Sequence, residues 1–191
     1  IRHGDDLFAA SMAEGAEVRH RYLFETPMDR ATFQSWLETK VAPDDPLFFV
    51  VVDKATGRAE GRQCLMRIEP AHGVIEIGSI LWGPNMARSR LATEALYLFA
   101  ATAFDTLGYR RFEWKCDNRN EPSKRAALRF GFHHEGLFRQ HMVMKGLNRD
   151  TAWFSIIDSD WPTLKARYLA WLDPANFDAE GRQKTQLSPR D

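Results

Sequence analysis

Three short stretches with strand patterns, separated by brief polar turns, fill residues 47–81, and one long helical pattern follows them over residues 88–107. The first and third stretches are apolar and rich in β-branched residues, the second has alternating apolar residues, and connections this short join antiparallel strands. The helical pattern has two adjoining apolar rows and ends at Gly108. A helix of this length reaches about 30 Å, which is enough to cross a whole sheet face. The sequence therefore predicts an antiparallel meander covered by a helix.

Strand and helix patterns alternate through the rest of the chain. We expect amphipathic helices over 5–13 and 29–40, with residues 19–27 between them as a packed connector or a loop that lines a site. After the long helix the order is a strand at 111–116, a helix at 122–130, a strand at 132–143, a turn at 145–150, a strand at 151–157 and a helix from Trp161 to about 172. This is an α/β chain of the layered α+β kind, with a single domain over residues 1–172 and a polar C-terminal tail over residues 173–191, which we expect to be mobile from residue 178 onwards.

Charge and composition exclude several classes of protein. The 191 residues carry 26 Lys or Arg and 26 Asp or Glu, so no overall field attracts nucleic acid or an anionic membrane. No apolar run approaches the roughly 20 residues needed to cross a bilayer, and residues 1–10 are too polar for a signal peptide, so we expect a soluble, cytoplasmic protein. Cys64 and Cys116 do not form a disulfide framework or a metal motif, and we expect no metal site.

The junction before the long helix, residues 83–90, is the segment best placed to bind a ligand. A helix start offers unpaired N–H groups and the positive end of the helix dipole, which together bind phosphate. Arg88 and Arg90 add positive charge there. The sequence has neither a Walker loop nor a dinucleotide-binding glycine fingerprint, which argues against kinase and dehydrogenase functions. Because every helix has such an end, this feature alone does not decide the function.

Five segments in register resemble the GNAT N-acetyltransferases, and within them the RimJ/RimL-like branch. Together they cover most of residues 5–161 and follow the expected order of strands and helices. The matching segments are Ile75–Gly78 with Leu81–Trp82, Arg88–Ala95, Asn120–Ser123, Gly131–Phe132 with Glu135–Gly136, and Asn148–Ser155. The resemblance implies the GNAT fold, a mixed, mostly antiparallel central sheet of about six to seven strands flanked by helices, whose fourth and fifth strands splay apart.

The resemblance also implies that acetyl-CoA binds along the edge of the strand at 74–81 and at the start of the long helix. The residues assigned to acetyl-CoA on this basis are Ile77, Gly78, Ala87, Arg88, Ser89, Arg90, Leu91, Ala92, Thr93, Asn120 and Ser123. Arg88 and Arg90 stand where the phosphate-binding loop of the family usually has two glycines. Their bulk restricts the approach of the backbone to phosphate, while their charge favours phosphate binding.

Glu76 and Ser123 are the catalytic candidates. Acetyl transfer needs one group that takes a proton from the attacking ammonium and another that protonates the departing thiolate. Glu76 lies on the strand face opposite Ile75 and Ile77, and it is either that base, acting through water, or a hydrogen-bonded strand carboxylate. Ser123 matches the general acid of the family, although by residue type alone it is a common residue of a first helical turn.

These observations predict an N-acetyltransferase that moves an acetyl group from acetyl-CoA directly to a primary amine, on a protein N-terminus or a small molecule. The alternative is a non-catalytic regulatory domain that binds acyl-CoA, because two arginines replace the glycines of the family. A nucleic-acid partner is not expected, although residues 124–129 form a basic run. A second copy of the chain is a candidate partner, because Trp153, Trp161 and Trp171 offer more aromatic surface than one face hides.

Overall fold

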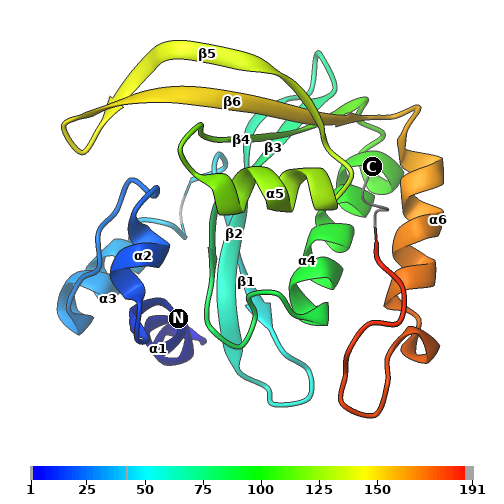
Figure 1. Ribbon diagram of the computed structural model, residues 1–191. Coiled ribbons are helices and arrows are strands. Elements are labelled where there is room, and N and C mark those ends of the chain that lie inside the picture. The colour runs from blue at the N-terminus through cyan, green and yellow to red at the C-terminus, as the bar shows by residue number, and fades with distance from the viewer. Residues whose placement is uncertain (1, 42, 188–191) are drawn as a thin grey trace.

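The computed structural model describes residues 2–41 and 43–187, and Figure 1 shows how their helices and strands are arranged. The helices are α1 (Gly4–Met12), α2 (Ala16–His20), α3 (Arg30–Glu38), α4 (Arg90–Ala101), α5 (Glu121–Arg129) and α6 (Trp161–Leu172), with a π-helical turn at Thr102–Thr106 and a 3-10 turn at Pro174–Asn176. The strands are β1 (Leu47–Val52), β2 (Ala59–Glu69), β3 (Val74–Trp82), β4 (Arg111–Asp117), β5 (His133–Met144) and β6 (Leu147–Ile157). Within these residues, no helix is both long enough and apolar enough to span a membrane.

The strands form one sheet in the order β1-β2-β3-β4-β6-β5. Neighbouring strands pair antiparallel except β3 and β4, which run parallel because α4 provides the crossover between them. Three helices that follow β3 in the sequence pack against the centre of this sheet. The arrangement confirms the predicted mixed, mostly antiparallel sheet flanked by helices, with six strands in the part of the chain that the structure describes.

The parallel strands β3 and β4 separate part-way along their length. They pair only where Val74–Ile77 lies beside Arg111–Trp114, although both strands continue beyond that point. One extra residue of β3 bulges between Gly78 and Leu81, where Ser79 takes a left-handed φ of 49°. The two strands therefore present unpaired edges to each other, which is the splayed arrangement that the resemblance implies.

The two faces of the sheet differ in chemistry. Alternate residues of β3, β4 and β6 form an apolar face against α4, α5 and α6, and this cluster is the main core. Its largest sheet residues, each at most 4% exposed, are Ile75, Ile77, Phe112, Trp114, Phe154 and Ile156. The intervening positions on the same strands carry charged side chains, among them Glu76 and Lys115. Glu76 thus lies on the face opposite Ile75 and Ile77, as the alternation predicts.

Helices α1 and α3 pack on β1 and β2 through a second, smaller core. Its buried members are Leu7, Phe33, Leu37 and Ala59. Figure 1 shows α1, α2 and α3 grouped at one side of the sheet, away from α6. The segment predicted as a connector, residues 19–27, begins inside α2, and the residues after α2 line the cavity described below.

The hairpin of β5 and β6 corrects one prediction. The turn expected at residues 145–150 is wrong, because β5 runs to Met144 and β6 already begins at Leu147. Lys145 and Gly146 form the turn, with left-handed φ values of 51° and 74°. Two consecutive left-handed residues match the twist of antiparallel strands, which favours this short turn. The polar residues that suggested a longer turn therefore belong to β6.

The segment after α6 folds back onto the domain. Asn176 is buried, and its Oδ1 accepts hydrogen bonds from the N–H and the hydroxyl of Thr185 at 3.0 and 2.7 Å. Leu187 is only 6% exposed and joins the main core. The polar composition of residues 178–191 predicts a mobile tail, but these contacts hold Thr185 and Leu187 against the domain. Residues 188–191 of that predicted tail lie outside the described residues.

The aromatic surface that made a second copy of the chain a candidate partner is mostly internal. Trp161 and Trp171 are each 4% exposed and belong to the main core. Trp153 is half-buried, and its ring packs against Phe138 with ring centres 4.5 Å apart. These tryptophans stabilise the fold of one chain, so the argument for a dimer from exposed aromatic rings loses its basis.

Candidate active site

A cavity of about 1440 Å³ lies where β3 and β4 separate. Its described lining contains twelve Lys or Arg side chains and three carboxylates, in a chain whose formal net charge is zero. The cations are Arg19, Arg21, Lys40, Arg67, Arg88, Arg90, Lys115, Arg119, Arg125, Arg129, Arg149 and Arg182, and the carboxylates are Glu25, Glu76 and Asp117. The positive charge of the protein is therefore concentrated around this cavity, which favours anionic ligands.

The start of α4 forms one wall of the cavity. Ser89 caps the helix, because its Oγ accepts a hydrogen bond from Ala92 N at 3.4 Å. Arg88 has a left-handed φ of 63°, a backbone conformation that favours glycine. The position that the family usually fills with glycine thus keeps a glycine-like backbone and adds an exposed cation. The N–H groups of this helix end and the charge of Arg88 together suit a phosphate group.

Arg90 lines the same wall, but its hydrogen bond goes to another element. Its Nη2 donates to Leu172 O at 2.7 Å, and its guanidinium carbon lies 5.4 Å from the centre of the Phe177 ring. These contacts tie the start of α4 to the end of α6 and to the segment behind it. Leu91 packs against a small core cluster formed by Met86, Ala92 and Ala95, and it is not among the described lining residues. The other residues assigned to acetyl-CoA all line the cavity.

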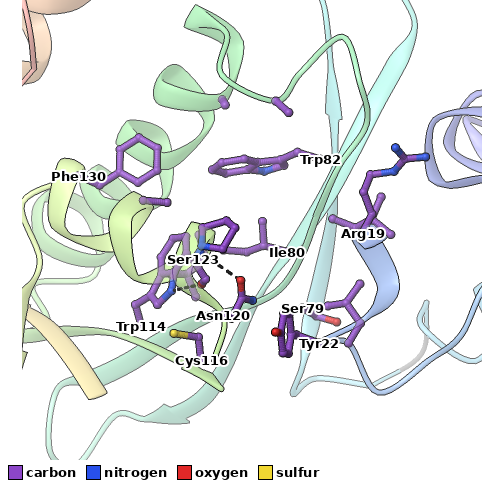
Figure 2. A pocket seen from close by; sticks show the side chains of 18 of the residues that line it. Arg19, Tyr22, Ser79, Ile80, Trp82, Trp114, Cys116, Asn120, Ser123 and Phe130 are labelled. Carbon is purple, nitrogen blue, oxygen red and sulfur yellow. Dashed lines mark hydrogen bonds between the residues drawn. The ribbon is translucent and has the colours of Figure 1, made fainter. Parts of the chain in front are cut away.

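Ser123 lies in the first turn of α5, grouped with Trp114, Cys116 and Asn120 (Figure 2). Its Oγ accepts a hydrogen bond from Trp114 Nε1 at 3.0 Å, and its N–H donates to Asn120 Oδ1 at 3.2 Å. Asn120 is therefore the N-cap of α5 as well as a cavity residue. The bond from the indole uses an acceptor site of Ser123 Oγ and leaves its hydroxyl proton to donate. Cys116 is a neighbouring acceptor, because hydrogen bonding by Ser123 opposes the rise that burial causes in the pKa of its thiol.

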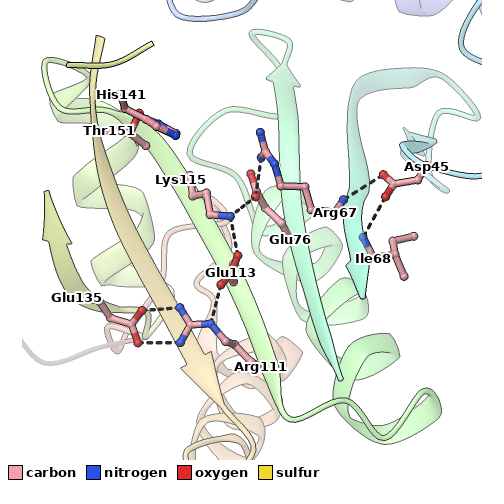
Figure 3. A network of polar contacts seen from close by, with 10 residues as sticks. All are labelled: Asp45, Arg67, Ile68, Glu76, Arg111, Glu113, Lys115, Glu135, His141 and Thr151. Carbon is pink, nitrogen blue, oxygen red and sulfur yellow. Dashed lines mark hydrogen bonds and ion pairs between the residues drawn. The ribbon is translucent and has the colours of Figure 1, made fainter. Parts of the chain in front are cut away.

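Glu76 lies on the polar face of the sheet and is only 3% exposed. Its Oε2 pairs with Arg67 Nη1 at 2.7 Å and with Lys115 Nζ at 2.8 Å (Figure 3). Lys115 also pairs with Glu113 Oε2 at 2.7 Å. Since both cations are bound through Oε2, Oε1 is the oxygen of Glu76 left to contact a ligand or a water in the cavity.

Arg111 extends this network across β4 and β5 (Figure 3). Its Nε donates to Glu113 Oε1 at 2.6 Å, and its two terminal nitrogens donate to the two oxygens of Glu135 at 2.9 and 2.5 Å. The Arg111 guanidinium lowers the pKa of Glu135 to about 2. The alternating charges connect the surface of β5 to Lys115, and through Lys115 they fix the position of Glu76.

Sequence patterns alone do not single out Lys115 or Arg149, although both line the cavity. A signal for Lys115 is present, because β4 carries charged residues at every second position within residues 111–117 and apolar residues between them. That alternation is typical of a strand with one polar and one apolar face. Arg149 gives no such signal, since the polar residues around it resemble a turn.

Cys64 and Cys116 both line the cavity and are buried. Burial raises the pKa of Cys64 to about 12 and also raises the pKa of Cys116. A thiol is a nucleophile only as its thiolate, so burial keeps both side chains in the unreactive form at neutral pH.

A family model described as an acetyltransferase (GNAT) domain matches residues 1–133, which is more than half of the chain. The chain belongs to the GNAT family. A GCN5-related N-acetyltransferase from Brucella melitensis is 62% identical to this GNAT domain, with a TM-score of 0.96 over 97% of this chain and 85% of that one. A probable acetyltransferase from Chromobacterium violaceum ATCC 12472 is 44% identical, with a TM-score of 0.78 over 84% and 80% of the two chains.

Curated relatives match this GNAT domain over shorter stretches. An uncharacterized N-acetyltransferase of Bacillus subtilis (strain 168) is 34% identical over 74 residues, which are 39% of this chain and 42% of the relative. The chain spans less than two thirds of the length of the curated relatives that it matches. These relatives support the family, and the acceptor has to be argued from the site itself.

Proposed function

We propose that this GNAT domain transfers an acetyl group from acetyl-CoA directly to a primary amine. The observation that carries the proposal is one cavity at the opening of the sheet, lined by Ser123 from α5 and by Glu76 from the polar face. Domains of this family bind acetyl-CoA or CoA. The RimJ/RimL-like branch is part of the proposal, supported by Asn120 and Ser123 at the start of α5.

The residues on the donor side fit acetyl-CoA. Backbone N–H groups of residues 87–93 and the charge of Arg88 suit its pyrophosphate. Beyond Ile77 the edge of β3 that faces β4 has no partner strand, so on that side the backbone around Gly78 can hydrogen-bond the amides of the pantetheine arm. When bound, acetyl-CoA supplies an activated thioester carbonyl as the acetyl donor.

Glu76 and Ser123 take the two proton-transfer roles in this proposal. An ammonium cannot attack, so Glu76 receives the amine proton through a water at Oε1. The hydroxyl of Ser123 donates its proton to the departing sulfur, and Trp114 Nε1 orients Oγ for this from 3.0 Å. The buried, unreactive thiols of Cys64 and Cys116 support transfer without a covalent acetyl-enzyme intermediate.

The test combines binding and turnover in one sample. Acetyl-CoA is titrated calorimetrically into the protein, and free thiol is then followed after addition of N-terminal peptides and small primary amines. The proposal predicts binding followed by thiol release that depends on the amine. Binding without release by any amine would instead support a non-catalytic acyl-CoA-binding domain, and absence of binding would contradict the proposal.

A further inference from the structure

Arg149 on β6 is a buried cation that the roles above leave unused. Only 8% of the residue is exposed, yet it lines the cavity. Its Nε donates to Thr151 Oγ1 at 3.1 Å, and its Nη1 donates to the sulfur of Met144 at 3.8 Å. Both partners are neutral, and none of the described carboxylates forms an ion pair with Arg149. Its positive charge is therefore buried without a direct counter-ion.

The carboxylates nearest to Arg149 are committed to other cations. Asp117 accepts hydrogen bonds from Arg119 Nε and Nη2 at 3.0 and 2.7 Å. Glu76 pairs with Arg67 and Lys115. Burial lowers the pKa of Arg149, and Asp117 is the charge that most opposes this shift. Because these carboxylates already pair with other cations, an additional anion in the cavity could pair with Arg149.

A buried cation is stable when a hydrogen-bonded anion pairs with it. The guanidinium group of arginine binds a carboxylate through two parallel N–H donors, which a neutral amide cannot match. We propose that Arg149 binds a carboxylate carried by the acceptor, so that the substrate is a primary amine that also bears a carboxylate. This inference rests on the proposed acetyl transfer and adds the substrate class.

The charges around Arg149 support an acceptor of this kind over a polyamine. Arg67, Lys115, Arg119 and Arg149 face the cavity together with the carboxylates of Glu76 and Asp117. In this arrangement the single amine of the acceptor lies towards Glu76, and its carboxylate pairs with Arg149. A second ammonium group in place of the carboxylate would meet the unpaired guanidinium and be repelled.

The first arm of the experiment measures kcat/KM by thiol release with matched acceptors. The pairs are free amino acids against their carboxamides, and peptides with Asp against peptides with Asn beside the N-terminal residue, with a linear diamine added. We expect carboxylate acceptors to exceed their amide partners by roughly tenfold or more, and the diamine to be the poorest acceptor. The two kinds of pair tell whether the carboxylate belongs to a free amino acid or to an acidic peptide side chain. Equal rates for carboxylates and amides in the native protein would overturn the inference without any variant.

The second arm uses Arg149→Gln, Arg149→Lys and the control Arg139→Gln, which removes an exposed cation from the same hairpin. Arg149→Gln should lose the preference for carboxylates while keeping most of its activity on amides, and Arg139→Gln should keep the preference. Arg149→Lys retains the charge, guards against misfolding of the Gln variant, and should show an intermediate preference. An equal loss of kcat/KM on carboxylates and amides would mean that Arg149 acts on the acetyl donor or stabilises the fold, and it would overturn the inference.

A binding readout separates this inference from the proposed function. The CoA-saturated protein is titrated calorimetrically with an N-acetyl amino acid and with its carboxamide. Tighter binding of the carboxylate, lost in Arg149→Gln, supports the inference even if no amine is acetylated. Turnover of amines with no preference in either arm sustains the proposed function and rejects the inference.

Discussion

At the scale of single residues, Ser123 and Glu76 differ in what already holds them. Ser123 Oγ accepts one hydrogen bond from a neutral indole, whereas Glu76 is bound by two cations. Removal of the serine hydroxyl takes a hydrogen-bond acceptor from the buried Trp114 indole but leaves no charge without a partner. Removal of the carboxylate charge leaves the buried Lys115 short of a partner. We therefore expect the substitution at Glu76 to lower the stability of the fold more than the substitution at Ser123 does.

Ser123→Ala should lower kcat by roughly tenfold or more, because the departing sulfur loses its proton donor. Calorimetry should find acetyl-CoA binding nearly intact, since the start of α4 is unchanged. Ser159→Ala, an exposed serine in the turn before α6, is the matched control. If kcat of Ser123→Ala equals that of the native protein, Ser123 has no role in the mechanism and is only a residue of the first turn of α5.

Glu76→Gln should also lower kcat by roughly tenfold or more, and it should lower the melting temperature because its ion pairs are lost. Glu69→Gln, at the exposed end of β2, is the control for a change of charge alone. The melting temperature and kcat are measured on the same preparations. A lower melting temperature with an unchanged kcat would make Glu76 a structural carboxylate and not the base.

At the scale of elements, the start of α4 combines a strained backbone with a useful charge. Arg88 at a φ of 63° has the same backbone penalty that alanine would have, whereas glycine has none. In denaturant unfolding, Arg88→Gly should therefore exceed Arg88→Ala in free energy of unfolding by about 1 kcal/mol. Both variants should bind acetyl-CoA more weakly than the native protein. Equal stabilities would argue against strain, and native affinity in both would remove Arg88 from the phosphate site.

The ion pair between Arg111 and Glu135 joins β4 to β5 and gives a pH prediction. The pKa of Glu135 is lowered to about 2 in the folded protein, from the ordinary value of 4.5 for a glutamate. A lowered pKa stabilises the fold above pH 4.5, and this contribution declines as pH falls from 4.5 to about 2. Melting temperatures should therefore be lower for Glu135→Gln than for the native protein at neutral pH and should converge towards pH 2. A difference that stays constant over this range would show that the ion pair is not its cause.

At the scale of the whole molecule, the sequence predicts the fold better than the site. The strand patterns within residues 47–81 and the long apolar stripe of α4 predict the sheet and its main covering helix, and period two over Ile75, Glu76 and Ile77 assigns Glu76 to the correct face. The partners of Glu76 come from β2 and β4, and such long-range contacts leave no pattern in a local stretch of sequence. The position of Arg149 on β6 depends on a two-residue turn, whereas the polar residues around it suggest a longer one.

A chain with no net charge can still bind anionic ligands when its charges are unevenly distributed. Its 26 basic and 26 acidic residues cancel overall, but the cavity lining is strongly cationic because most of the acidic residues lie elsewhere. A local field of this kind attracts phosphate and carboxylate groups over short distances. We therefore propose that donor and acceptor bind in one positively charged cavity at the opening between β3 and β4.

Intact mass spectrometry of both acceptor and protein after a single turnover tests whether the acetyl group passes directly from acetyl-CoA to the amine. The protein is mixed with acetyl-CoA and a carboxylate-bearing amine, and the masses are read before and after the thiol is released. Direct transfer predicts one acetyl group on the amine and an unmodified protein. An acetyl group retained on Cys116, or an unmodified amine beside bound acetyl-CoA, would contradict direct transfer at this site.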